Sequence, residues 1–586
     1  MATRGIYGLS GSGIDVDSMV KVGMLSKQNQ YDKMYKKEIK NEWIKQAYAD
    51  VYSKLSTFTN STMSTYKRSY TTNPMSVSSN NTSIATATAN SDAAQMSHTI
   101  TVNSVAANAY MQTEDKLTRN SGAQATSIAL TDFFDTTQLK AEYDADKKNK
   151  ADEVALSFTL TDAADQVDGR DNADQNKAVI NFTFADLFDS NQTLNDLVSK
   201  INAAGTNIQA SYDSTNDSFS LFQKNGGEAN QINISVTNYT DDVTSKIDGT
   251  NTDVSGHADN AARELINNLH LAQVTTDKDG NQSLATLATL TAPSFDDPDN
   301  PSPGTDTISA KGTDGSATID GKTYNTTSQK LTVANVTYTL GTTGTTTMTV
   351  SQDTDKIVEN VKQFVEDYNK MMDELTSKYN EKKYSDYDVL TKSQENAMTQ
   401  EQIDKWNEKA KSGLLYHNQS IGKIRSAMRE AMYTPVESVN SSYNTMMSIG
   451  IESSTDQGHI SLNEDKLKKA LAADPDCVYQ IFASSGDTKA ADGTSTTDYD
   501  KEGVINRITD SLYANMKEMK SYAGTSTEAS DGSSLGDLIL EMQTKMSNFK
   551  TQMDAFENAL YKKYDAMEST IQQLTAQFNY MVGGNS

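Results

Sequence analysis

The residue types that most often do chemistry in proteins are few and scattered in this sequence. The single cysteine, Cys477, has no CxxC partner and no histidine near it in sequence, so we interpret it as a structural thiol. No HExxH run occurs, and none of the five histidines has the spacing of a metal ligand. These are His98, His257, His270, His417 and His459. We therefore expect no enzyme, no metal site and no cofactor.

Two short segments look like ligand-binding loops and fail on their spacing. GLSGSGID (residues 8–15) is rich in glycine, but it does not follow a strand, so a turn before a capped helix is the better interpretation. DKDGNQS (Asp277–Ser283) begins like a calcium loop. Its glycine stands at the fourth position instead of the sixth, and Ala288 occupies the position where glutamate would be needed. We interpret it as an acidic surface turn.

Charge and composition exclude several classes of partner. The 586 residues carry a formal net charge of −26, and only 36% of them are apolar. Such a polyanion is repelled by phosphate backbones and by anionic lipid, so neither nucleic acid nor membrane is expected as a partner. The first residues contain no apolar core of a signal peptide, and no run is long enough to span a membrane. The length predicts several domains.

The first part of the chain has the apolar period of a long helix. Trp43, Ala47, Val51, Leu55 and Phe58 recur at spacings of four and three residues. Either Asp15 or Asp17 can cap this helix, which we expect to run from about Asp17 to Tyr66.

The last part of the chain has the strongest pattern in the sequence. Apolar residues follow one another by threes and fours, close to the coiled-coil period, and methionine and phenylalanine dominate. The stripe consists of Leu535, Leu538, Met542, Met546, Phe549, Met553, Phe556, Leu560, Tyr564, Met567, Ile571, Leu574, Phe578 and Met581. It predicts long helix–helix packing and leaves open whether the partner helix belongs to the same chain.

Between these ends the apolar period changes to two, as in strands. A short helix is expected at about Asn195–Ala203, a loop at the proline-rich Ala292–Gly304 and another at the polar Ala483–Tyr499. Helices return after Asp353. The expected strands are Ser97–Ala106, Val154–Asp162, Ala178–Phe184, Ser218–Gln223, Ile232–Asn238, Lys330–Leu340 and Thr345–Gln352.

The sequence thus predicts an α+β protein of several domains in which a β-rich region is inserted between helical ends. Paired, coiled-coil-like terminal helices are expected at 1–45 and 536–586, disordered when free. A mixed helical and β leg domain is expected at 46–108 and 352–535. A β-rich head, with two subdomains, is expected at 109–351.

Short motifs follow one another in collinear order along the chain: a Gly-Ser-Gly-Ile-Asp start, a Phe-Val-x-x-Tyr-Asn return and a Gly-Ile element. They resemble motifs of the flagellar hook-associated protein 2 family, and Thr193–Gln223 resembles the flagellin hook IN motif. The matching positions are Gly11, Ser12, Gly13, Ile14, Asp15, Ile201, Asn202, Phe364, Tyr368, Asn369, Gly450 and Ile451. The resemblance covers both ends nearly completely.

The resemblance implies a cap at the tip of the bacterial flagellar filament. It implies a ring of several copies, contacts with flagellin and hook–filament junction proteins, an export chaperone at the C-terminal helix, and secretion through the flagellar type III apparatus without a cleaved signal peptide. The seam expected to contact the filament or another copy comprises Met546, Phe549, Met553, Phe556, Leu560, Met567, Ile571, Leu574 and Phe578. Two alternatives stay open here: another flagellar axial protein, or a surface adhesin whose β head binds host glycans or mucin.

Overall fold

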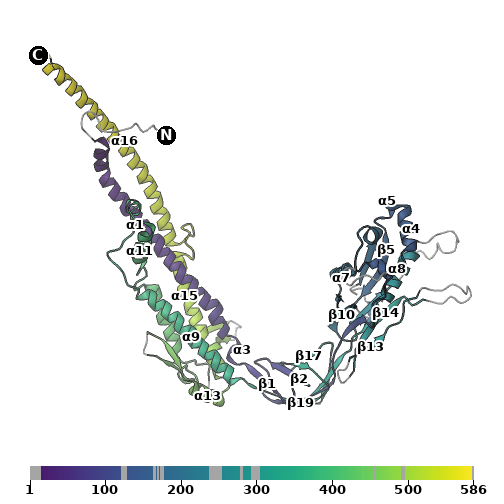
Figure 1. Cartoon of the computed structure of the whole chain (residues 1–586). Coiled ribbons are helices and arrows are strands. Elements are labelled where there is room, and N and C mark those ends of the chain that lie inside the picture. Colours follow the sequence, from purple (N-terminus) through teal and green to yellow (C-terminus); the bar gives the residue numbers. More distant parts are fainter. Residues whose placement is uncertain are drawn as a thin grey trace, which may run out of the picture. The chain divides into compact units, whose positions relative to one another are not determined.

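The structure is a computed structural model that describes residues 15–120, 128–162, 166–167, 170–171, 177–236, 254–277, 282–291, 304–439, 441–454, 457–489 and 495–583. The chain divides into two compact units (Figure 1). The helical unit contains Met1–Pro74 and Asp353–Ser586, and the β unit contains Met75–Gln352. The predicted insertion of a β-rich region between helical ends is confirmed. Residues 75–108 lie in the β unit, although the sequence analysis assigned them to the leg domain, because their strands pair with others of that unit.

The helical unit is built from long amphipathic helices around one apolar core. Leu55, Phe364, Phe482, Ile508 and Ile539 all belong to that core and are completely or almost completely buried. Its elements are α1 (Val16–Thr57), a π-helical turn (Phe58–Met63), α2 (Ser64–Tyr66), α3 (Ser69–Thr72), α9 (Thr354–Tyr379), α10 (Lys392–Asn396), α11 (Gln400–Lys411), α12 (Gln419–Tyr433), β20 (Ile451–Ser453), β21 (Ile460–Leu462), α13 (Glu464–Ala473), α14 (Cys477–Ala483), β22 (Ser485–Lys489), β23 (Ser495–Glu502), α15 (Val504–Ala523) and α16 (Ser534–Gly583).

The β unit consists of antiparallel sheets and has two separate apolar cores. Its elements are β1 (Met75–Ser79), β2 (Ala85–Ala89), β3 (Ser97–Ser104), β4 (Asn108–Thr113), a 3-10 turn (Leu130–Phe133), α4 (Thr137–Ala145), α5 (Lys147–Lys150), β5 (Val154–Thr161), β6 (Gln166–Val167), β7 (Arg170–Asp171), β8 (Lys177–Thr183), α6 (Phe184–Phe188), α7 (Leu194–Ala203), β9 (Ile208–Asp213), β10 (Ser218–Gly226), β11 (Gln231–Ser235), α8 (Val254–Asn268), β12 (Leu271–Thr276), β13 (Gln282–Thr286), β14 (Thr307–Lys311), β15 (Gly315–Ile319), β16 (Lys322–Thr326), β17 (Lys330–Val333), β18 (Val336–Leu340) and β19 (Gly344–Gln352).

The sheets show how the two cores arise. One core lies on the sheet of order β1-β19-β3-β15-β16 and the small sheet β17-β18-β2. The other lies between the sheets β13-β12-β4-β10-β9 and β14-β11-β5-β8, with α7 and α8 packed against them. Strands β3 and β4 follow one another directly along the chain and belong to different sheets, so this short connection links the two cores.

Most of the predicted elements are found; one predicted loop is wrong, and one helix is missing from the prediction. Each expected strand segment contains an observed strand, and Lys330–Leu340 is a hairpin of β17 and β18 that turns at Ala334 and Asn335, both with positive φ. Ala483–Tyr499 was predicted to be a loop and instead contributes most of the hairpin β22–β23. Its described side chains are mostly polar and exposed, so the apolar alternation typical of a strand is missing. The helix α8 was not predicted, and residues 292–303 lie outside the described residues.

Candidate functional site on the paired terminal helices

The helix α1 starts where the sequence places a capping residue. Of the two candidates, Asp15 is the cap: its carboxylate accepts hydrogen bonds from the backbone N–H of Ser18 at 3.0 Å and from the Ser18 hydroxyl at 2.5 Å. These hydrogen bonds hold the pKa of Asp15 below its usual value. The other motif positions near this start, residues 11–14, lie outside the described residues.

The two terminal helices α1 and α16 pack against one another antiparallel (Figure 1). Near the start of α1, the Tyr561 hydroxyl donates to Asp17 at 3.0 Å; further along, the Gln543 side chain donates to Glu38 at 2.9 Å. From the first contact to the second, the residue number rises on α1 and falls on α16, so the two helices are antiparallel. The partner of the C-terminal stripe, left open by the sequence, is therefore a helix of the same chain.

A buried lysine fixes the register of this pair. The side chain of Lys45 is completely buried, and its ammonium donates to the Ala523 carbonyl at 2.7 Å, to the Asp531 carboxylate at 2.6 Å and to the Ser533 hydroxyl at 3.0 Å. All three donor positions of the ammonium are thus used. A buried charge is strongly destabilising when it loses its partners, so α16 cannot slide along α1 without a large cost.

Toward the start of α1, a small residue and two aromatic rings bring the two helices into close contact. A Cβ atom on Gly23 would stand 2.7 Å from a methyl carbon of Leu560, so glycine lets the leucine approach the α1 backbone. The ammonium of Lys27 lies 5.2 Å from the ring centre of Phe549 and 5.9 Å from that of Phe556. Glycine inside a helix is destabilising in isolation. At position 23 it allows α16 to pack closely against α1.

The predicted seam is buried in its first part and becomes exposed toward its end. Met546 and Met553 are buried; Phe549, Leu560, Met567 and Ile571 are half-buried; Phe556, Leu574 and Phe578 are exposed. The stripe needs one correction at its start, because Leu538 is exposed and the neighbouring Ile539 is buried in its place. The helix α16 shifts the buried face by one residue there so that Leu535, Ile539 and Met542 follow at spacings of four and three.

The end of α16 extends past the first described residue of α1, Val16 (Figure 1). The part that follows Tyr561 has about 20 residues and a length of about 30 Å at 1.5 Å per residue. Its apolar side chains have no cover among the described residues: Leu574 is 58% exposed, Phe578 64% and Met581 75%. Large apolar side chains gathered on one exposed helix end are typical of an interaction surface.

Two asparagines among the motif positions connect a helix to a strand. Asn202, at the end of α7, donates to the Ala210 carbonyl at 3.0 Å and accepts from the Ala210 N–H at 2.8 Å. Asn369 on α9 does the same for Ile460, with distances of 2.8 and 2.9 Å. Each side-chain amide replaces a missing strand neighbour, and both residues are therefore structural.

The remaining motif positions form the cores of the two units. Ile201, Phe364, Tyr368 and Ile451 are buried. Gly450 has a φ of +90°, and a Cβ atom there would lie 2.6 Å from the Asn463 carbonyl oxygen, so only glycine fits. None of the described motif positions lies on the exposed end of α16, so the motifs identify the fold, and the seam as an interaction surface stays a prediction.

Reactive groups do not gather in the described part of the chain. Cys477 is buried, and this burial raises the pKa of its thiol to about 12, so it stays protonated. His98 bonds the carboxylate of Asp320 and His459 bonds that of Asp373, both at 2.6 Å. Among the described residues there is no cluster of three or more His, Cys, Asp or Glu that could hold a metal ion, and no helix with the length and hydropathy to cross a membrane.

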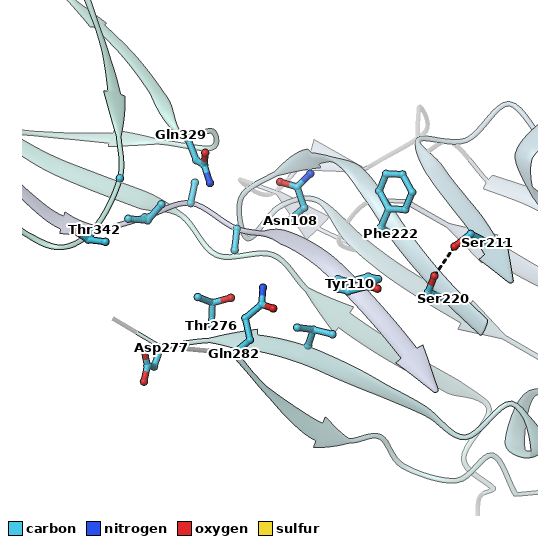
Figure 2. A pocket seen from close by; sticks show the side chains of 15 residues that line it. Asn108, Tyr110, Ser211, Ser220, Phe222, Thr276, Asp277, Gln282, Gln329 and Thr342 are labelled. Atoms are coloured by element: carbon cyan, nitrogen blue, oxygen red, sulfur yellow. Dashed lines mark hydrogen bonds between the residues drawn. The ribbon is translucent and has the colours of Figure 1, made fainter. Parts of the chain in front are cut away.

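The β unit also has a surface hollow of about 610 Å³ near the connection between β3 and β4 (Figure 2). Tyr110 and Phe222 lie on one side, and the polar side chains around it include Ser211 and Ser220, whose hydroxyls are 2.8 Å apart. Asp277 is the one carboxylate in its described lining, so the acid–base pair that hydrolytic chemistry requires is missing from that lining.

Fold and site together define a class of structural protein: the two chain ends pair as antiparallel helices, a β-rich unit is inserted between them, and one helix ends in exposed apolar residues. The family models agree with this class. Those described as flagellar hook-associated protein 2 N-terminus and C-terminus match residues 12–109 and 312–576, and the flagellin hook IN motif matches residues 188–225. The chain belongs to the flagellar hook-associated protein 2 family, and it is a flagellar filament cap protein.

The chain is also similar to individual proteins. The chain is 27% identical to flagellar hook-associated protein 2 of Halalkalibacterium halodurans, with 97% of each chain covered. It is 26% identical to the protein of the same name from Thermotoga maritima, over 40% of this chain and 34% of that one. The crystal structure of the flagellar cap protein D1-D2-D3 domains from Escherichia coli is 19% identical, covers 82% of this chain and 97% of its own, and has a TM-score of 0.45.

Proposed function

We propose that several copies of this cap protein form a ring at the tip of the flagellar filament and that the free end of α16 attaches the ring to the filament. Flagellin subunits then fold and insert beneath the ring instead of being lost to the medium. One observation carries this proposal: Leu574, Phe578 and Met581 are exposed on a helix end that extends past its partner. In water this apolar surface is unfavourable, and a contact with filament subunits would bury it.

The same helix end supports the proposals for the other partners. During export it is the surface that a chaperone would cover, because exposed apolar helices aggregate when left free. Hook–filament junction proteins would meet it where the first cap assembles on a new filament. Export through the flagellar type III apparatus requires an unfolded chain, and the single cysteine means that no intramolecular disulfide opposes unfolding.

The test is to place charge on the exposed end. Leu574→Asp with Phe578→Asp puts two carboxylates into the proposed contact, where burial of an unpaired carboxylate is strongly unfavourable even after it takes up a proton. Because both side chains are exposed, the fold of the protein should not change. We expect cells with this variant to release flagellin monomers and to build short filaments or none, counted by electron microscopy.

The matched control is Gln572→Asp with Asn579→Asp, which adds the same charge on another side of the same helix end, where both residues are exposed. It should leave filament length near normal. Normal filaments with the Leu574 and Phe578 variant, at normal export, would show that this end is not the attachment. Normal filaments in a complete deletion of the protein would contradict the cap function.

A further inference from the structure

The helical unit contains a groove of about 820 Å³ between α9, α12 and α15. Its lining includes Arg425 and Arg429 from α12, Tyr379 from the end of α9, and Glu518 from α15. The two arginines stand four residues apart, so they lie on the same face of α12, one turn from one another. The groove is thus lined by two neighbouring cations in a chain whose net charge is −26.

The arginines of the groove, Arg425 and Arg429, make no hydrogen bond or ion pair in the described part of the chain. The Nε atom of Arg425 is buried without an acceptor. Elsewhere, Arg119 and Arg263 are paired with carboxylates. In the groove itself, Lys423 is paired with Glu518 at 2.9 Å. A buried N–H without an acceptor is unusual in proteins, so the environment of Arg425 calls for an explanation.

An aromatic ring holds one of these arginines in place. The guanidinium of Arg425 lies 4.9 Å from the ring centre of Tyr379, and Tyr379 is itself stacked on His417 with ring centres 4.9 Å apart. A guanidinium with one face on an aromatic ring can still use its two terminal Nη groups, and these can bind a carboxylate with two parallel hydrogen bonds. Glu430 is the other carboxylate on the lining, and it makes no ion pair with either arginine.

We propose that this groove receives carboxylate side chains of a second copy of this chain within the ring; the inference therefore rests on the proposed function. A neighbouring copy is itself strongly acidic, so it supplies the complementary charge. Symmetry favours a ring in particular. Across a twofold axis at the groove the arginines would face arginines, whereas a head-to-tail contact joins two different surfaces and closes into a ring.

The test measures self-association of the full chain by sedimentation velocity over a concentration series. We expect Arg425→Glu with Arg429→Glu to raise the concentration for half-assembly tenfold or more. Arg429→Glu alone gives a second variant that avoids the packed Arg425, because Arg429 is exposed. It should weaken assembly severalfold. Added salt should weaken the assembly of the unchanged protein, because it screens the charges in the groove. It should weaken the assembly of the double variant much less.

The matched control is Lys466→Glu with Lys469→Glu on α13, which makes the same change in net charge at two exposed lysines outside the groove. It should assemble as the unchanged protein does. Circular dichroism melts confirm that each variant is folded. If the unchanged protein forms rings and both arginine variants form them equally well, the groove inference is wrong and the ring stands. If the unchanged protein stays monomeric at every concentration, the ring and the groove contact both fail.

Discussion

Two glycines of the helical unit show two different reasons why a turn requires glycine: a left-handed backbone and a lack of space for a side chain. Gly450 has a φ of +90° and also has no room for a side chain, since a Cβ atom would stand 2.6 Å from a carbonyl oxygen. Gly532 has a similar φ of +74° and nothing within 4 Å of its Cβ position. The first position combines backbone strain with a steric clash, and the second has the strain alone.

We therefore expect Gly450→Ala to lower the free energy of unfolding by more than about 2 kcal/mol and Gly532→Ala by about 1 kcal/mol, the typical cost of a left-handed conformation for alanine. Urea unfolding followed by circular dichroism measures both values. Equal losses at the two positions would mean that the neighbourhood of Gly450 yields without cost.

Two carboxyl groups one turn apart on α1 give the helical unit a dependence on pH. Partial removal from water, together with the neighbouring carboxylate of Glu38, raises the pKa of Glu42 to about 7 from its ordinary 4.5. A group whose pKa is raised by folding stabilises the folded state while it is protonated. Its contribution is complete below about pH 4.5 and is lost as the pH rises through about 7.

Replacing Glu42 by glutamine should therefore flatten the fall in stability between pH 5 and pH 8. Because Glu42 is exposed and solvent screens its charge, we expect a gain of less than about 1 kcal/mol at pH 8. Thermal unfolding at the two pH values measures this. The control Glu366→Gln, at an exposed site on α9, should leave the slope unchanged, and an unchanged slope in the Glu42 variant would contradict the prediction.

At the scale of elements, α16 is one continuous helix with two different environments. Its first turns are covered by α1, with Ile539, Met542, Met546 and Met553 buried, and its last turns are exposed. An isolated helix in water is only marginally stable, so the covered part of α16 is stable because it packs against α1. The terminal helices at 1–45 and 536–586 are expected from the sequence to be disordered when free, and this stays a prediction.

The burial of side chains up to Met553 places the start of the unprotected part of α16 later in the chain than the sequence predicts. We expect amide hydrogens of Ser534–Met553 to exchange slowly in the monomer and those after about Tyr561 to exchange within seconds, because local opening is easiest where few apolar contacts hold a segment. Hydrogen exchange with mass spectrometry resolves the two parts. Uniformly slow exchange to the end of α16 in a monomer would show that the free end is stable without a partner.

The elements also show what a sequence can predict. Long stripes such as the one in α16, and the strands rich in Val, Thr and Ile, are visible because burial imposes a clear period. The helix α8 was missed because its buried face combines two alanines, Ala261 and Ala262, with only a few larger residues. The groove of the helical unit was missed for another reason: Arg425 and Tyr379 lie 46 positions apart, and only the fold brings them together.

For the whole molecule, the important feature is the place where the chain passes between the two units. The Asp353 N–H donates to the Pro74 carbonyl at 2.9 Å, so the outgoing and returning segments leave the helical unit side by side. The cores of the two units share no residue. Each unit therefore has its own source of stability.

We expect residues 75–352 to fold as an isolated fragment, and a chain in which a glycine–serine linker of about four residues replaces them to keep the helical unit folded. Calorimetry of each product should give cooperative unfolding at nearly the temperatures at which the same unit unfolds in the full chain. A fragment that unfolds without a cooperative transition would show that one unit depends on the other.

The buried Lys45 fixes the position of α16 along α1. A repeat of methionine and phenylalanine could pack almost as well after a slip of seven residues, about 10 Å, along the partner helix. That slip would remove Asp531 and Ser533 from the ammonium and leave its positive charge buried without a carboxylate, with the Ala523 carbonyl still in place on α15. This ion pair at the opposite end of the helix pair therefore helps to fix how far the exposed end of α16 reaches. Every copy in an assembly would then present its tip at the same distance, which a level rim requires.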